Sequence, residues 1–167
     1  MEPMEIIRTL RGDEDGDSPQ ELLAELGNIP DAVAYAQLFW PDVIALHGSA
    51  IIDIHGYGVS EVESRLERTV QRHGPGRSVG EWRDWVDSFN YFEVAHLFRN
   101  FVDFGEREHE AHLAFARLLV PPWQARLDAM TSVTTHPQVR VTEEIEGAGI
   151  CVAVSQQIGS ENCPLGW

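Results

Sequence analysis

Residues 43–54 read VIALHGSAIIDI, two short apolar runs on either side of the dipeptide Gly48-Ser49. Runs of this length around a glycine-containing dipeptide predict a β-hairpin with a two-residue loop. Because side chains alternate between the faces of a strand, one face is predicted to carry Val43, Ala45, Ile52 and Ile54, and the other Ile44, Leu46, Ile51 and Asp53. Both faces are apolar, so we expect other elements to cover both.

A second hairpin is predicted at residues 139–154, which read VRVTEEIEGAGICVAV. Apolar and polar residues alternate in its first half, Gly147-Ala148-Gly149 marks the turn, and the second half is apolar. Helical patterns occupy most of the chain between the two hairpins. The sequence therefore predicts an α+β fold, in which the hairpins form one antiparallel sheet of about four strands that packs against several helices.

The segment from Pro30 to Trp40, directly before the first hairpin, predicts a helix that Pro41 ends. Proline suits the first turn of a helix, and few polar side chains interrupt the apolar ones. We therefore expect this helix to be central and buried.

Two capping boxes predict two further helices. Ser60–Glu63 opens one that ends at Gly74, a surface helix with an ion pair between Glu61 and Arg65. Ser78–Glu81 opens the other, in which aromatic residues follow at helical spacing.

A later helix is predicted from Glu106 to Val120. Pro121-Pro122 should break it, because proline lacks the backbone N–H that a helix uses. A short helix from Trp123 should then fold back on it.

These patterns divide the chain into three parts. Residues 1–17 end in a run of Asp, Glu and Gly, and we expect a mobile acidic segment there. Residues 18–158 are predicted to form a single α+β domain, and residues 159–167 a C-terminal tail.

The charge balance narrows the class of partner. The net charge is −15, and all 12 basic residues are arginine, a usage typical of GC-rich bacterial genomes. An acidic surface repels phosphate, so direct nucleic-acid binding is not expected, whereas a basic protein partner is compatible. No apolar run is long enough for a membrane span and the N-terminus does not resemble a signal peptide, so we expect a cytoplasmic protein. Cys151 and Cys163 are too few for a disulfide framework and are predicted to be free thiols.

Histidines and nearby acidic residues are the candidates for chemistry. Glu108, His109 and His112 form a dense titratable cluster, but the histidines are three apart, whereas the zincin pattern needs four. We therefore predict no metal and no cofactor. An alternative interpretation is a small hydrolase or isomerase that uses His96 or this cluster. Asp53 and His55 are a further possible acid–base pair, although strand-end polar residues explain them as well.

The predicted function is a non-catalytic acidic binding protein that engages a basic protein partner. The tryptophans at this helical spacing are typical of core residues, and one that is exposed would serve as an interface anchor. The predicted contact residues therefore combine tryptophans with acidic neighbours. They are Trp82, Asp84, Trp85, Asp87, Glu143, Glu144 and Glu146. A third interpretation, a small-molecule sensor or carrier, requires an aromatic-lined cavity of several hundred Å³ near Trp82, Trp85 and Tyr35.

The segment Tyr35-Ala36-Gln37-Leu38-Phe39-Trp40-Pro41-Asp42 resembles a run in a group of small uncharacterised bacterial proteins. In that group a strand pair follows the Phe-Trp-Pro, and an Asn/His stretch, a Trp-bearing helix and a closing hairpin come later. The corresponding parts here are Asn90–His96, Trp123–Leu127 and Val139–Gln157. Size and acidity are similar to those of immunity partners of bacterial toxins, so the resemblance implies a toxin as one candidate for the basic partner.

Overall fold

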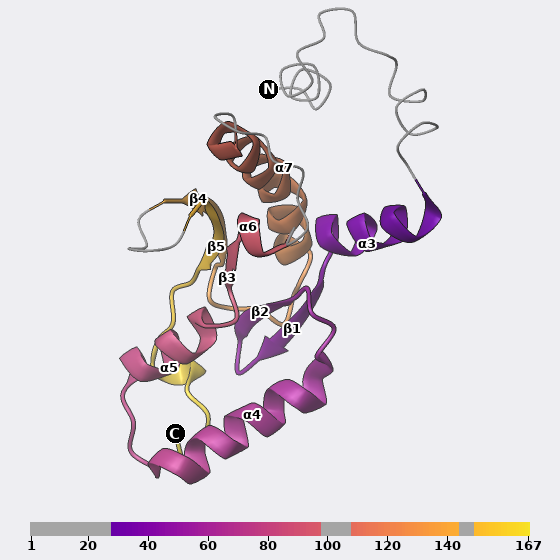
Figure 1. Cartoon of the computed structure of the whole chain (residues 1–167). Helices are drawn as coiled ribbons and strands as arrows, with labels where there is room; N and C mark the ends of the chain where they lie inside the picture. The colour runs from indigo at the N-terminus through magenta and orange to yellow at the C-terminus, as the bar shows by residue number, and fades with distance from the viewer. Residues whose placement is uncertain (1–27, 98–107, 144–148) are drawn as a thin grey trace, which may run out of the picture.

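The computed structural model describes residues 28–97, 108–143 and 149–167 (Figure 1). In chain order its elements are α3 (Ile29–Phe39), β1 (Asp42–Leu46), β2 (Ser49–Asp53), α4 (Gly58–His73), α5 (Val79–Asp87), β3 (Tyr91–Glu93), α6 (Val94–Leu97), α7 (Glu108–Asp128), β4 (Gln138–Thr142) and β5 (Cys151–Ser155), followed by a 3₁₀-helix at Ser160–Asn162. The predicted α+β class is confirmed. Glu144, Glu146 and the predicted N-terminal segment 1–17 lie outside the described residues.

The strands form two antiparallel sheets rather than the single sheet predicted. β1 pairs with β2, and a second sheet has the order β3-β5-β4. β3 begins directly after Asn90, shortly beyond the end of α5 at Asp87, and it pairs with β5. The Asn90 side chain accepts from the N–H of Ile52 at 3.0 Å and donates to the carbonyl of Ala50 at 2.8 Å. Its own carbonyl accepts from Val154 N–H at 3.0 Å, so one residue joins the two sheets.

The first hairpin turns at His47-Gly48, one residue earlier than predicted. Both residues have positive φ, 50° and 79°, as a type I′ turn requires. Val43 therefore pairs with Ile52 rather than with Ile54. This shift of two residues leaves every side chain on its predicted face. Both faces are covered, as predicted, because each belongs to a different core.

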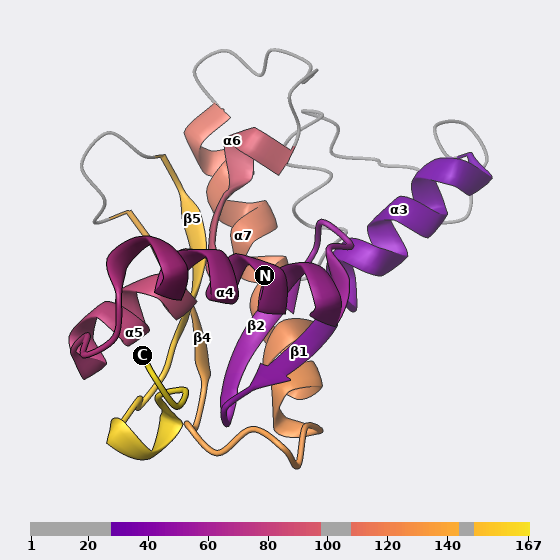
Figure 2. The ribbon, with the colours of Figure 1, turned by 90° about the horizontal axis from the view of Figure 1, so that it is seen from below.

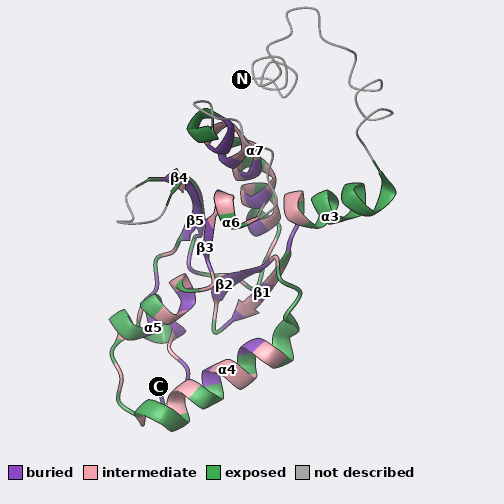
Figure 3. Cartoon of the chain, in the orientation of Figure 1, coloured by how far each residue is buried: buried purple, intermediate pink, exposed green. Residues whose placement is uncertain are grey.

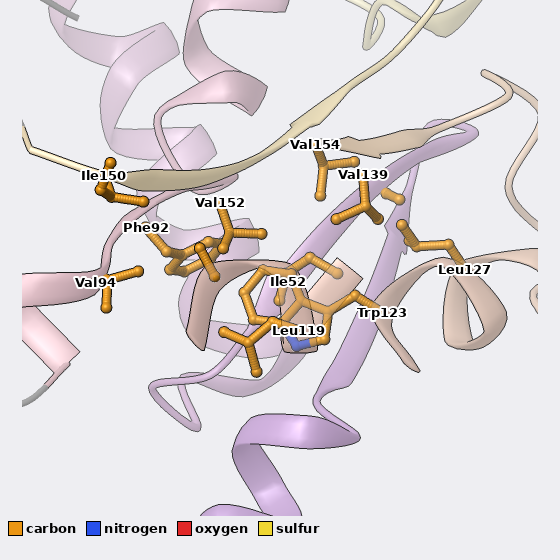
Figure 4. Packing of buried hydrophobic residues seen from close by; sticks show 12 residues of the cluster. Ile52, Phe92, Val94, Leu119, Trp123, Leu127, Val139, Ile150, Val152 and Val154 are labelled. Atoms are coloured by element: carbon orange, nitrogen blue, oxygen red, sulfur yellow. The ribbon is translucent and has the colours of Figure 1, made fainter. Parts of the chain in front are cut away.

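The first core lies between α7 and the strands, as the close view in Figure 4 shows. Trp123 and Leu119 of α7 meet Phe92 of β3 and Ile52 of β2, and the rings of Trp123 and Phe92 are 5.1 Å apart. Trp123 also donates its indole N–H to the Leu38 carbonyl at 2.7 Å. α7 and the end of α3 are thereby fixed to the sheet.

The second core lies on the other side of the hairpin, under α4 and α5. Trp82 is fully buried there, together with Ile44, Ile51 and Val62. Trp167 packs edge-on against Trp82 at 5.1 Å and is only 6% exposed. Trp167, the last residue of the predicted C-terminal tail at 159–167, therefore belongs to this core, and Cys163 packs against it, whereas Leu165 is fully exposed. The small polar residues of this segment make loop-like turns that end on a buried tryptophan.

The prediction that the segment from Pro30 to Trp40 forms a central, buried helix is wrong in one respect: the helix forms, as α3, but it is exposed. None of its residues is buried, and Figure 3 shows it exposed along most of its length. Ile29 and Val33 are 80% and 64% exposed. The last turn packs on α7, where the ring of Phe39 meets that of Phe115 at 6.0 Å. An apolar helix is buried only if neighbouring elements reach it, and here α7 reaches one end alone.

α7 continues through Pro121-Pro122, which had been predicted to break it. Two prolines remove two helical hydrogen bonds. However, Leu119 before them and Trp123 after them are both fully buried in the first core. Packing on both sides of the prolines therefore outweighs the missing hydrogen bonds.

Two further predictions concern membrane-spanning helices and the two cysteines. No helix within residues 28–97, 108–143 and 149–167 has the length and apolar character needed to cross a membrane. Cys151 and Cys163 are free thiols, as predicted. Burial raises the pKa of both thiols.

Candidate ligand-binding groove

A groove lies between α4 and α5. Figure 1 shows these two helices at the end of the molecule opposite α7, and Figure 2 views the molecule from that end. The groove is open and has a volume of about 540 Å³. Basic, aromatic and hydroxyl side chains line it: Arg65, Arg68, Thr69, Arg72, His73, Trp85, Ser88 and Phe89. We call it the α4–α5 groove.

The pattern of α4 brings the arginines to this groove. Val62 and Leu66 are buried and fix the helix on the second core. Arg65, Arg68 and Arg72 follow at spacings of three and four, which place them along one side of the helix, next to the buried stripe. A row of guanidinium groups therefore faces α5.

Arg65 and Arg68 share one acidic partner. The Glu61 carboxylate accepts from Arg65 and from Arg68, each at 3.0 Å, so the predicted Glu61–Arg65 pair is confirmed. These hydrogen bonds, that of Arg65 first, hold the pKa of Glu61 below its ordinary value. The Arg65 guanidinium also stacks 4.0 Å from the centre of the Tyr57 ring.

Arg72 and His73 stand at the other end of the row. Both are exposed, and no carboxylate among the described residues lies within ion-pair distance of either. Arg72 therefore offers a guanidinium whose hydrogen-bond donors face solvent in the groove.

The opposite wall is aromatic and rigid. The Trp85 ring stacks on that of the buried Trp82 at 5.0 Å and 13°, and meets Phe89 at 4.8 Å. Trp167 supports the pair from the side. Because three rings contact Trp85, its position in the wall of the groove is preorganised.

A smaller hollow of about 140 Å³ adjoins the groove. Arg65, Ser88 and Phe89 line both spaces. The remaining lining residues of the smaller one are Ile52, His55, Tyr57 and Phe92. We call it the inner hollow.

The predicted contact residues on α5 have different environments. Trp82 is fully buried in the second core and offers no surface to a partner, because the indole fills the space under α4. Asp84 is exposed, Trp85 is half-buried in the groove, and Asp87 is half-buried beside Arg83 and Arg140. Of the four, Asp84 and Trp85 are placed to meet a ligand or partner.

Glu143 lies away from α5 and has a partner within the chain. Its carboxylate is 3.6 Å from Nε2 of His109, which joins the end of β4 to the start of α7. The other two acids predicted with it, Glu144 and Glu146, are outside the described residues.

The candidate chemical residues have separate roles. His96 is exposed, with Nδ1 3.0 Å from the Glu93 carboxylate, and His112 is buried. Glu108 is exposed. Among residues 28–97, 108–143 and 149–167, no three His, Cys, Asp or Glu side chains gather as metal ligands.

Asp53 caps a helix instead of pairing with His55. Its carboxylate accepts from the backbone N–H of Tyr57 at 2.9 Å and of Gly58 at 2.7 Å, where α4 begins. α4 therefore starts at Gly58, before the predicted cap at Ser60. His55 instead packs its ring 5.2 Å from that of Tyr57, at the edge of the inner hollow.

Sequence reasoning missed the α4–α5 groove. A signal was present, because Arg65, Arg68 and Arg72 repeat at helical spacing in a strongly acidic chain. Their meeting with Trp85 and Phe89 depends on how α4 and α5 pack, which neither helix encodes alone. Comparisons with protein-family models, with curated proteins and with solved structures find no match to this chain.

Proposed function

We propose that this chain is a non-catalytic binding protein that holds a small anionic ligand in the α4–α5 groove. The observation that carries the proposal is the row of Arg65, Arg68 and Arg72 opposite the preorganised Trp85, around a hollow of about 540 Å³. Ligand pockets of several hundred Å³, with a few convergent polar groups and aromatic walls, are typical small-molecule sites.

The lining favours an anion over other ligands. Guanidinium groups stay protonated at all physiological pH values, and their planar donors match carboxylate and phosphate oxygens. Arg72 has no carboxylate partner among the described residues, so a bound anion would complete its interactions.

The charge of the chain favours a small anion over a polyanion. A net charge of −15 repels an acidic macromolecule over the whole approach. A small ligand escapes much of this field at physiological ionic strength, where the Debye length is about 8 Å. Nucleic acid therefore stays an unfavoured partner.

The groove also favours binding over proton transfer. Of the described residues that line it, only His73 belongs to a type that titrates near neutral pH. Of the residues considered for an enzyme, His96 is paired with Glu93 and His109 with Glu143, and neither histidine lines the groove. His55 lies at the edge of the inner hollow, but Asp53, its possible acid–base partner, instead accepts from the backbone N–H groups of Tyr57 and Gly58.

Isothermal titration of the full chain with inorganic phosphate, at low ionic strength, tests the proposal. We expect saturable binding that Arg72→Gln weakens roughly tenfold, the loss of one charge-assisted hydrogen-bonding group. Arg117→Gln is the matched control, because Arg117 is an exposed arginine on α7, away from the groove. No binding, or equal losses in both variants, would contradict the proposal.

A basic protein partner, such as a toxin, is the second candidate. Asp84 favours it, because this carboxylate stays exposed beside the half-buried Trp85, as an acidic interface with an aromatic anchor requires. Affinity purification from the native host at low salt should recover a basic protein that Asp84→Asn loses. A partner retained equally by Asp84→Asn and by the wild type would argue against this face.

A further inference from the structure

We infer that the α4–α5 groove and the inner hollow form one site, whose ligand carries an aromatic ring and an anionic group. This inference rests on the proposed binding function and names the class of ligand. The ring lies in the inner hollow, and the anion lies on the arginine row of α4.

The two spaces lie side by side and share part of their walls. Arg65, Ser88 and Phe89 line both, so a ligand can reach from one into the other past these three side chains. Ser88 is small and exposed at this junction, and its hydroxyl donates to the Trp85 carbonyl at 2.6 Å. The passage is therefore bounded by a short side chain that points back to its own helix.

The inner hollow suits one aromatic ring. Its volume is about 140 Å³, and an apolar cavity of about 150 Å³ is known to hold benzene. Ile52 and Phe92 supply its buried apolar wall. Tyr57 and His55 add aromatic rings at its rim. A planar ring can therefore make stacked or edge contacts on several sides.

Helix geometry sets the separation between ring and anion. Arg65 stands beside the inner hollow, and Arg68 and Arg72 follow along α4. At a rise of 1.5 Å per residue, they lie about 5 Å and about 10 Å further along the helix axis. The ligand therefore has its carboxylate or phosphate a short chain away from its ring.

Glu61 sets the strength of the anion site. Its carboxylate already occupies donors of Arg65 and Arg68, as a ligand carboxylate would. It thus competes with the ligand for two of the three arginines. Glu61→Gln should raise the affinity for 3-phenylpropionate severalfold, while Glu67→Gln, an exposed glutamate on the same helix, should not. Equal effects of the two variants would show a general charge effect and overturn this role.

Titration of the full chain with matched probes tests the inference. The ring-bearing anions are 3-phenylpropionate and phenyl phosphate, the anions without a ring are propionate and inorganic phosphate, and the ring without an anion is 3-phenylpropanol. We expect each ring-bearing anion to bind roughly tenfold more tightly than its ringless counterpart, a difference of about 1.4 kcal/mol. The tighter of the two identifies the anion. 3-Phenylpropanol should bind much more weakly than 3-phenylpropionate.

Ser88→Phe separates the two halves of the site. The added ring should fill the junction and remove the gain from the aromatic ring, measured in this variant as the ratio of the affinities for phenyl phosphate and inorganic phosphate. A ring that adds no affinity, or a gain that survives Ser88→Phe, would overturn the inference while the proposed function stands. Failure of inorganic phosphate and of every ring-bearing anion to bind would overturn both.

Discussion

Asn90 is a fully buried polar residue whose hydrogen bonds are all within the protein. Its side-chain amide pairs with the free edge of β2, as a neighbouring strand would, through Ile52 N–H and the Ala50 carbonyl. The Gln156 amide does the same one step along, accepting from Ala50 N–H at 2.7 Å and donating to its carbonyl at 2.8 Å. Two side chains thus replace a strand between the sheets.

Asn90→Ala should lower the free energy of unfolding by about 2–3 kcal/mol. The change leaves the buried N–H of Ile52 without its partner, and an unsatisfied buried donor costs about 1–3 kcal/mol. Urea unfolding measures the loss. Asn28→Ala is the control, since Asn28 caps α3 at an exposed position and its loss should cost about 1 kcal/mol or less. Similar small losses in both variants would contradict the bridging role.

The contribution of Asp87 to the stability of the fold should change with pH in the direction opposite to that of most paired carboxylates. Burial, more than any neighbour, raises the pKa of Asp87. The folded state therefore binds this proton more tightly than the unfolded state, and the stability of the fold falls as pH rises through the interval between the two pKa values.

Asp87→Asn should consequently stabilise the protein at neutral pH. The difference from wild type should shrink as the pH falls below the ordinary Asp pKa of about 3.9, where both states are protonated. Urea unfolding across this pH range checks it. Asp84→Asn removes one charge from the same helix at an exposed position and serves as the control. If Asp87→Asn has a lower free energy of unfolding than the wild type at neutral pH, the prediction is refuted.

At the scale of elements, the start of α4 is capped by the buried carboxylate of Asp53, which accepts hydrogen bonds from two backbone N–H groups there. Asp53→Ala should destabilise the protein by about 1–2 kcal/mol, because Tyr57 and Gly58 lose their acceptor. Ser60→Ala, at the cap that the sequence pattern predicts, should change stability by less than about 0.5 kcal/mol. Thermal unfolding of both variants compares them directly. If Ser60→Ala loses more stability than Asp53→Ala, then Ser60 and not Asp53 is the residue that caps α4.

The sequence predicted those elements that depend on neighbouring residues. The hairpin at 43–54 forms with its predicted faces, although its turn is one residue earlier, and the α5 capping box of Ser78 and Glu81 forms as expected, since short-range hydrogen bonds and alternation determine both. β3 was not predictable, because a strand of three residues, Tyr91–Glu93, is defined by its pairing with β5. The exposure of α3 and the continuity of α7 through Pro121-Pro122 likewise depend on what packs against each helix.

The candidate site was predictable only in part. Trp85 and Asp84 were singled out from the sequence, and both lie at the groove or beside it. The same pattern selected Trp82, which points inward, because residues three apart on a short helix can face different neighbours. The helical spacing of the three arginines can be recognised in the sequence. That they line a groove cannot, because the groove exists only where α5 packs opposite α4.

For the molecule as a whole, the net charge of −15 predicts a response to salt. Repulsion between like charges destabilises the compact state, and salt screens it, with a Debye length that falls from about 30 Å at 0.01 M to about 8 Å at 0.15 M. The Tm should therefore rise with NaCl over this range. KCl should give the same rise at equal ionic strength. A falling Tm would show that attractive ion pairs outweigh the repulsion.

The burial of β2 on both faces has a consequence for how fast its amide hydrogens exchange with solvent. Every residue from Ser49 to Asp53 is buried, between the two cores. The Ala50 and Ile52 amides bond to the side chains of Gln156 and Asn90 instead of to a strand that could fray. Their exchange in D₂O should require global unfolding, and so be slower than that of any amide in the exposed α3. Nuclear magnetic resonance would reveal faster, local opening if either side-chain bond breaks on its own.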